Sequence, residues 1–119
     1  MVGTSSEFDT VLELCQEQHR RISVALLAHE NRALTVDDLT KAIVKHNHHQ
    51  PLMEVPEEIP REIQFSLIHV HLPKLEALSL IEYDAERKLV TPTPRFDQLE
   101  PQLSAIIETD PGLEPPVAL

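Results

Sequence analysis

The sequence predicts a mainly α fold with a small β-hairpin. Two upstream segments with apolar residues at helical spacing precede a third, residues 65–78, which runs directly into two β-prone segments, residues 80–84 and 89–91. A last helical segment follows. The order helix, helix, helix, hairpin, helix is that of a winged helix-turn-helix (α-α-α-β-β-α), in which the third helix enters a DNA groove and the hairpin is the wing. We expect this fold and treat DNA binding separately, because a fold does not determine a function.

The length and the prolines predict one domain with short ends. A chain of 119 residues supports a single hydrophobic core. Residues 1–6 precede the first apolar period and are expected to be a flexible N-terminus, and residues 7–108 form the predicted winged-helix domain. Residues 109–119 carry three prolines and no apolar period, so we expect a disordered tail there.

Capping residues place the first two helices. The first opens at Ser6, with an acidic residue three positions later, and runs to about His29. The second opens at Thr35 with the same spacing, and residues 33–34 before it form a brief predicted strand. The expected buried faces are Phe8, Val11, Leu12, Cys15, Ile22, Ala25 and Leu26 in the first helix, and Val36, Leu39, Ala42 and Ile43 in the second.

The third predicted helix follows a loop, residues 46–60, that is longer than the turn of a minimal helix-turn-helix. The helix starts at Pro60, whose missing N–H would be unpaired there anyway, or one turn earlier at residues 56–58. Pro73 lies inside it and should bend it or be offset by local packing. A helical wheel predicts an unusually wide apolar arc, made of Phe65, Ile68, Leu72 and Leu75 on one side and Ile63, Leu67, Val70 and Leu78 on the adjoining side.

The end of the domain is predicted to be a hairpin and a fourth helix. Residues 80–84 and 89–91 are the strands, and the polar residues 85–88 are the tip between them. The helix should begin near Asp97 so that Pro101 falls in its first turn. Since the apolar arc of the third helix exceeds what a monomer needs, we expect a homodimer through the first and last helices. The apolar residues of the fourth helix are Phe96, Leu99, Leu103, Ile106 and Ile107.

The charge of the chain bears on its partners. Twenty acidic residues against ten basic ones give a net charge of -10, which normally argues against a nucleic-acid partner. The objection weakens for a halophile, because at molar salt the Debye length falls to about 3 Å and an acidic surface keeps the protein hydrated. An acidic surface that binds another protein explains the same count equally well.

The candidate DNA contacts divide into two kinds. On the third helix the solvated residues Glu62, Ser66 and His69 can hydrogen-bond base edges, although this face contains no lysine or arginine. Basic residues elsewhere are expected to bind phosphate rather than to read sequence. These are Lys41 and Lys45 on the second helix, Arg61 at the start of the third, and Arg87 and Lys88 at the hairpin tip.

Residues 71–84 read His-Leu-Pro-Lys-Leu-Glu-Ala-Leu-Ser-Leu-Ile-Glu-Tyr-Asp. The run resembles the end of the recognition helix and the start of the wing in arsenic-repressor-like winged helices, whose pattern is His-Leu-x-x-Leu-Glu-x-x-Gly-Leu-Val-Glu-Tyr. Ser79 stands where that pattern has glycine. Residues 8–107 as a whole are similar to small winged-helix proteins of haloarchaea. The matching positions are His71, Leu72, Leu75, Glu76, Leu80, Ile81, Glu82 and Tyr83.

The sequence contains few features of an enzyme, a cofactor-binding protein or a metal-binding protein. With two glycines and neither a nucleophile elbow nor a glycine-rich phosphate loop, we expect no enzyme and no cofactor. The histidines at positions 46, 48 and 49 could contribute to a metal site, but one cysteine in the chain makes a structural zinc site improbable, and we expect a polar loop. Cys15 lies on an apolar face and should be a buried, inert thiol.

The single cysteine also fits a reducing compartment. No apolar run approaches the length of a membrane span, about 18 residues, and residues 1–8 lack the pattern of a secretion signal. We therefore expect a cytoplasmic protein that does not bind a membrane.

These observations favour a DNA-binding transcriptional regulator of a halophilic archaeon, which binds duplex DNA as a dimer through the third helix and the wing. The alternative is a winged-helix interaction module that binds another protein and no DNA. A third possibility, a ligand-responsive or metal-responsive regulator, requires an internal polar pocket or a metal at the loop histidines.

Overall fold

The computed structural model describes residues 2–113 and Val117, and it describes side chains from Phe8 onward. The protein is mainly helical with a small three-stranded antiparallel sheet of order β1-β3-β2, so the predicted mainly α fold with a hairpin is confirmed. In chain order the elements are α1 (Val2–Leu14), α2 (Gln18–Glu30), β1 (Leu34–Thr35), α3 (Val36–His48), a 3-10 turn (Leu52–Glu54), α4 (Glu58–Ser66), a π turn (Leu67–His71), α5 (Leu72–Ala77), β2 (Ile81–Asp84), β3 (Leu89–Pro92) and α6 (Pro94–Ile107).

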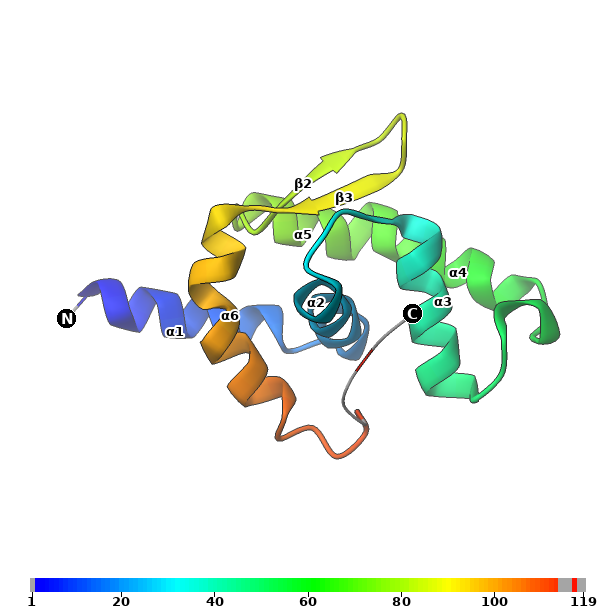
Figure 1. Ribbon diagram of the computed structural model, residues 1–119, viewed down its shortest axis with the longest axis horizontal. Helices are drawn as coiled ribbons and strands as arrows, with labels where there is room; N and C mark the ends of the chain where they lie inside the picture. Colours follow the sequence, from blue (N-terminus) through cyan, green and yellow to red (C-terminus); the bar gives the residue numbers. More distant parts are fainter. Residues whose placement is uncertain (1, 114–116, 118–119) are drawn as a thin grey trace.

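Helix α2 lies at the centre of the molecule, with α3, α6 and the helix formed by α4, the π turn and α5 around it (Figure 1). The β2–β3 hairpin extends from this body at one edge, and α1 projects from it at one end. The core is built almost wholly of aliphatic side chains from these helices and the sheet. Its largest fully buried members include Ile22, Leu26, Leu27, Leu39, Ile43, Leu67, Leu72, Leu75 and Leu80, together with Phe96.

The first helix was predicted as one continuous element, and this prediction is wrong. The helix is interrupted after Leu14, and α2 begins at Gln18. Residues 16–21 are all polar, and Glu17 adopts an extended conformation (φ -107°, ψ 132°). The arginines that follow satisfy the carbonyl groups at the end of α1. Arg20 donates from Nε to the carbonyl of Leu14 (2.9 Å) and from Nη2 to that of Glu13 (3.1 Å), and Arg21 donates from Nη1 to that of Cys15 (2.6 Å).

Helix α3 follows its prediction closely. The Thr35 hydroxyl accepts from the backbone N–H of Asp38, and the Asp38 carboxylate accepts from the backbone N–H of Thr35, so the capping box is complete. The predicted inner face is buried, with Val44 and Thr40 added to it. Local sequence is therefore enough to fix where this helix begins and which side it exposes.

The hairpin also forms as predicted, with Tyr83 opposite Val90 and Asp84 opposite Leu89. A third strand joins it, since Leu34 of β1 also pairs with Val90. Ser79 takes the left-handed conformation (φ 63°) that glycine usually provides at the end of a helix, and the N–H of Leu80 then reaches the carbonyl of residue 75 (3.0 Å).

The third predicted helix forms as α4, the π turn and α5 in succession, here called the α4–α5 helix. It begins at Glu58, which is the earlier of the two predicted starts. In the π turn the N–H of Leu72 reaches back five residues to the carbonyl of Leu67. The wider turn lies just before Pro73, whose ring would otherwise meet the carbonyl of residue 69. The π turn thus accommodates the proline.

The π turn changes which side chains are buried. One extra residue in a helical turn rotates everything after it by about 100° relative to the wheel of a regular helix. His71 is buried, whereas Phe65 and Val70, both predicted to lie on the apolar arc, are 66% and 53% exposed. These two members of the predicted apolar arc therefore lie at the surface of the single chain.

Helix α6 begins at Pro94, three residues before the predicted start, because Thr93 accepts from the N–H of Phe96 and so caps it there. Pro101 consequently lies inside the helix and not in its first turn. Within the segment expected to be a disordered tail, Asp110 forms an ion pair with Arg21 of α2 (2.8 Å), and Leu113 and Val117 are buried. None of the described helices is long and apolar enough to cross a membrane.

Candidate nucleic-acid interface

Three of the ten basic side chains hold α1 against the body of the protein. Arg20 and Arg21 cap the end of α1, and Lys74 of α5 forms an ion pair with Glu13. These three are therefore engaged inside the fold. The basic side chains left at the surface are Arg32, Lys41, Lys45, Arg61, Arg87, Lys88 and Arg95.

Lys41 and Lys45 lie one turn apart on the outer face of α3. Both are exposed, because Leu39, Ala42 and Ile43 occupy the opposite face and pack in the core. Neither lysine forms an ion pair with any of the residues that the structure describes. Their charges are available to a partner.

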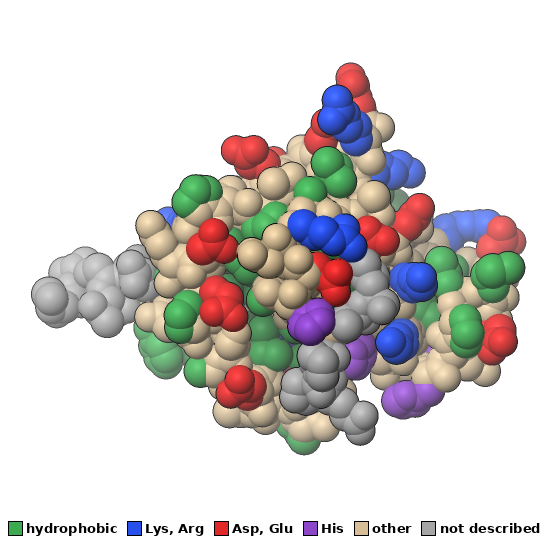
Figure 2. Space-filling view, viewed as in Figure 1, with side chains coloured by type: hydrophobic (Ala, Val, Ile, Leu, Met, Phe, Trp, Pro, Cys, Tyr) green, Lys and Arg blue, Asp and Glu red, His purple; other side chains and the backbone are tan. Residues whose placement is uncertain are grey.

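The tip of the hairpin adds two more cations. Arg87 lies 3.7 Å from Asp84, and since both side chains are well exposed this pair is weak. Lys88 has a left-handed backbone (φ 52°), and its carbonyl accepts from the N–H of Val36 (3.0 Å), which fixes the end of the tip beside the first residue of α3. Figure 2 shows basic side chains at the hairpin tip and over α3 on one face of the molecule. We call Lys41, Lys45, Arg87 and Lys88 the cationic group.

The predicted reading face on the α4–α5 helix is different in character. Arg61 pairs with Glu57 (3.6 Å) and Glu62 is exposed. The ring of His69 stacks on that of Phe65, with centroids 4.3 Å apart. Ser66 is half-buried and hydrogen-bonded to His71 (3.1 Å). This face therefore presents carboxylates and an apolar centre, while its serine hydroxyl is occupied inside the protein.

A buried polar cluster lies beneath that face. His71 is 5% exposed, with Nδ1 3.5 Å from Nη1 of Arg20 and Nε2 3.1 Å from the hydroxyl of Ser66. Since an arginine can only donate, Nδ1 is the acceptor and Nε2 carries the proton. The ring of His19 meets that of His71 edge-on, with centroids 5.8 Å apart. The cluster joins α2 to the π turn.

Both histidine rings are held neutral. Burial, and then the nearby Arg20, lower the pKa of His71, and burial lowers that of His19. The sequence patterns did not predict this cluster. The signal was the unbroken polar run 16–21, which no amphipathic helix would carry on its inner face.

Cys15 is buried, as expected, and burial raises the pKa of its thiol. A thiol in that state is a poor nucleophile. The loop histidines do not gather a metal site either: within the described residues, no group of three or more histidine, cysteine or acidic side chains is placed to hold an ion.

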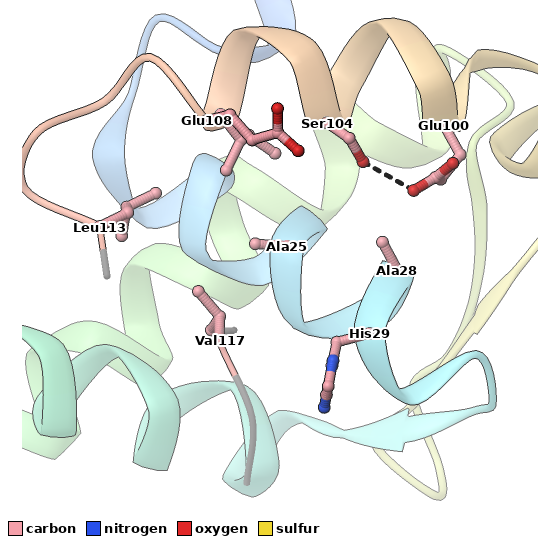
Figure 3. Close-up of a pocket in the computed structure, with 9 residues that line it drawn as sticks. Ala25, Ala28, His29, Glu100, Ser104, Glu108, Leu113 and Val117 are labelled. Carbon is pink, nitrogen blue, oxygen red and sulfur yellow. Dashed lines mark hydrogen bonds between the residues drawn. The ribbon is translucent and has the colours of Figure 1, made fainter. Parts of the chain in front are cut away.

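A pocket of about 250 Å³ lies between α2, α6 and the segment after it (Figure 3). On α6, Ser104 donates to the carboxylate of Glu100 (2.6 Å), and Glu108 lies one turn beyond. Two carboxylates disfavour an anionic ligand here, so the pocket is no phosphate site and stands apart from the cationic group. The rest of its lining is Ala25, Ala28, His29, Ile107, Leu113 and Val117.

Comparison with known proteins gives one match. Residues 12–91 fit the family model described as a domain of unknown function, DUF7344. That segment runs from the end of α1 to β3 and so includes the cationic group, the buried cluster and the whole α4–α5 helix. No curated protein and no solved structure matches the chain.

Proposed function

The chain belongs to the DUF7344 family, and we propose that it is a DNA-binding transcriptional regulator of a halophilic archaeon with a winged helix-turn-helix fold. The observation that carries the proposal is the cationic group: in a chain of net charge -10, four exposed cations occupy two adjoining elements, and three of them have no ion pair within the described structure. Such a surface suits phosphate.

The topology supports the fold assignment. Helix α2, strand β1, helices α3 and α4–α5 and then the hairpin follow one another in the order of a winged helix, and β1 pairs with the hairpin to complete the small sheet. In that architecture α3 is the second helix, the α4–α5 helix is the third, and β2–β3 is the wing.

The spacing of the cations suits a phosphate backbone. Lys41 and Lys45 are separated by about 6 Å along the helix axis, so both ammonium groups can contact the backbone of one DNA strand. The main chain of Lys88 is hydrogen-bonded to the first residue of α3, so this exposed lysine adds a cation where the hairpin meets α3. We therefore propose that the protein holds DNA mainly through phosphate contacts and shape, with little base readout by Glu62 or His69.

We further propose that the regulator is a homodimer formed through α1 and α6. Helix α1 projects from the body (Figure 1), and it exposes Phe8 and Leu12, which lie one turn apart on the same side. An exposed apolar edge on a projecting helix is suited to pairing with a second copy. The proposed regulator is cytoplasmic, and it needs neither a cofactor nor an enzymatic activity.

The alternative function is a winged-helix interaction module that binds no DNA. The observation that favours it is the acidic and apolar outer face of the α4–α5 helix, which repels phosphate and carries no free cation among the described side chains. The two functions make different predictions about salt. DNA binding must weaken as salt rises, whereas an apolar protein contact is largely insensitive to it.

The test is a fluorescence-anisotropy titration of the full chain with labelled genomic fragments across a series of salt concentrations. The triple variant Lys41→Gln/Lys45→Gln/Lys88→Gln removes the unpaired cations of the group. We expect it to weaken binding at least about tenfold and to reduce the slope of log K against log salt by about one for each lost contact.

Arg95→Gln is the matched control, since Arg95 is an exposed cation on α6 with no ion pair in the described structure. It should leave affinity and slope unchanged. Absence of saturable binding at every salt concentration would contradict the proposal, and so would equal binding by the triple variant and the native chain.

A further inference from the structure

We propose that the outer face of the α4–α5 helix is a docking surface for a partner protein that presents an apolar segment flanked by basic residues. The proposal concerns a different surface from the cationic group and does not depend on DNA binding. It assigns a role to the one part of the predicted reading helix that is poorly suited to nucleic acid.

The face consists of an apolar strip along the helix. Phe65, Val70, Pro73 and Ala77 are all exposed and recur at intervals of three to five residues, so they follow one side of the helix across the π turn. The His69 ring, stacked on that of Phe65, widens the strip. Scattered apolar residues are normal on a surface, but a contiguous row of this kind on one helix marks an interaction site.

The rim of the strip determines the charge of its partner. Glu58 and Glu62 flank the end near Phe65, and Glu76 flanks the end near Pro73. The one arginine of this face, Arg61, is already paired with Glu57. Carboxylates around an apolar centre complement a segment with lysine or arginine on both sides of an apolar row, and they repel DNA.

The same rim argues against a second copy of this chain as the occupant. In a two-fold dimer formed through this face, the rims of the two copies would meet, and like charges would be placed close together at an interface. On α1, the exposed apolar residues Phe8 and Leu12 have a single acidic residue between them in the sequence, which is Asp9. Self-association therefore suits α1 and the strip suits a different protein.

The helix beneath the strip is rigidly held. On its inner side Ile63, Leu67 and Leu75 are buried in the core, and the hydrogen bonds of His71 to Ser66 and Arg20 fix the π turn. A preformed surface loses little conformational entropy on binding. Phe65 precedes the π turn and lies on the side of α4 opposite Ile63 and Leu67, so the burial of those two side chains leaves its ring outside.

A direct test uses a synthetic amphipathic helical peptide, with leucines at helical spacing and lysines on both flanks, titrated into the full chain and followed by fluorescence anisotropy. The titration is done at physiological ionic strength, where ion pairs with the exposed carboxylates of the rim are only partly screened. A second peptide has the same leucines and glutamates in place of the lysines. We expect the lysine peptide to bind and the glutamate peptide to bind at least about tenfold more weakly.

The decisive comparison is between two pairs of exposed apolar residues. Phe65→Ser/Val70→Ser should weaken binding of the lysine peptide at least about tenfold, because both side chains would be buried by it. Phe8→Ser/Leu12→Ser removes another pair of exposed apolar side chains, on α1, and should leave peptide affinity unchanged. Because all four side chains are exposed, both variants should fold, which circular dichroism checks.

Several outcomes overturn the proposal. They are failure of the lysine peptide to bind, equal binding of the two peptides, and equal effects of the two variant pairs. Loss of DNA binding in Phe65→Ser/Val70→Ser with peptide binding intact would place the strip in a nucleic-acid surface instead. The triple lysine variant of the cationic group must retain peptide binding, so the failure of this proposal and that of DNA binding are separable.

Discussion

Helices α3 and α4–α5 pack against each other, yet different forces decide which side each of them exposes. In α3 a capping box sets the first residue, and the apolar period then buries Leu39 and Ile43 while it exposes Lys41 and Lys45. In α4–α5 the apolar period fails after the first two turns, and Phe65 is exposed while His71 is buried. Local sequence therefore determines which side α3 exposes, whereas contacts with distant parts of the chain determine which side α4–α5 exposes.

A π turn changes which residues of a helix are exposed. The extra residue is accommodated where Pro73 prevents a regular hydrogen bond, and the rotated turn is stabilised by Arg20, which is 51 residues away in sequence from His71. The outer face of α4–α5, and hence the proposed docking strip, depends on that contact. The outer face of α3, and hence the cationic group, does not.

The largest test of this contrast is Arg20→Met. Arg20 is buried and donates to two carbonyl groups and to His71, so its loss leaves several buried acceptors without a donor. We expect the free energy of unfolding to fall by about 3 kcal/mol, measured by urea denaturation at constant molar salt.

Arg32→Met is the control for Arg20→Met. Arg32 is exposed, and its contacts with the Glu30 carboxylate (3.4 Å) and the carbonyl of Ala33 (3.2 Å) both lie at the surface, so its replacement should change stability by less than about 0.5 kcal/mol. If the two variants were equally stable, the buried cluster would contribute nothing and the contrast between the helices would lose its physical basis.

The next test addresses the helix that is set locally. Thr35→Ala removes the hydroxyl that accepts from the N–H of Asp38 and leaves the start of α3 uncapped. Unfolding experiments should show a loss of about 1 kcal/mol. Thr91→Ala, at an exposed position of β3, is the comparison and should cost less. A loss for Thr35→Ala as large as that for Arg20→Met would mean that α3 is not governed by local capping alone.

The same contrast between local and distant contacts separates the features that the sequence predicts from those that it does not. The capping box at Thr35, the two strands of the hairpin and the inner face of α3 depend on residues within a few positions of one another, and periodicity and capping rules predicted them. The break after Leu14 and the inward turn of His71 depend on each other through Arg20. A single helical wheel contains no information about such a partner, so it placed Phe65 on the wide apolar arc and could not show which side of that arc the chain buries.

The same contrast holds for the residues of the candidate nucleic-acid interface. Lys41, Lys45, Arg87 and Lys88 are exposed, and their exposure was predictable because polar residues opposite an apolar stripe or at a hairpin tip face solvent. Ser66 was expected at a base edge, and its hydrogen bond to His71 could not be read from the sequence because it follows from the π turn. Glu62 and His69 are also exposed as expected, whereas the Ser66 hydroxyl beside the π turn is engaged inside the protein.

A smaller effect is expected at the end of α5, where a local rule is broken. Ser79 has φ 63°, a conformation that costs a residue with a side chain about 1 kcal/mol and costs glycine little. Ser79→Gly should therefore stabilise the protein by about 0.5 kcal/mol, after the greater flexibility of glycine in the unfolded chain is subtracted. Ser79→Ala keeps the strain and should bring no gain. Equal stability of the glycine and alanine variants would show that the turn is not strained.

The smallest effect is confined to mildly acidic pH and concerns His71 and His19. Burial lowers the folded-state pKa of both rings below their ordinary value of 6.5, so the unfolded chain binds protons more readily than the folded protein does. The stability that depends on neutral rings is fully present above pH 6.5 and is lost as the pH falls from there through the folded pKa values. His71→Gln keeps a side chain that can accept from Arg20 and does not titrate. Urea denaturation between pH 8 and pH 5 should therefore show a shallower loss of stability in this variant than in the native protein, and identical slopes would mean that His71 is not held neutral by the cluster that turns it inward.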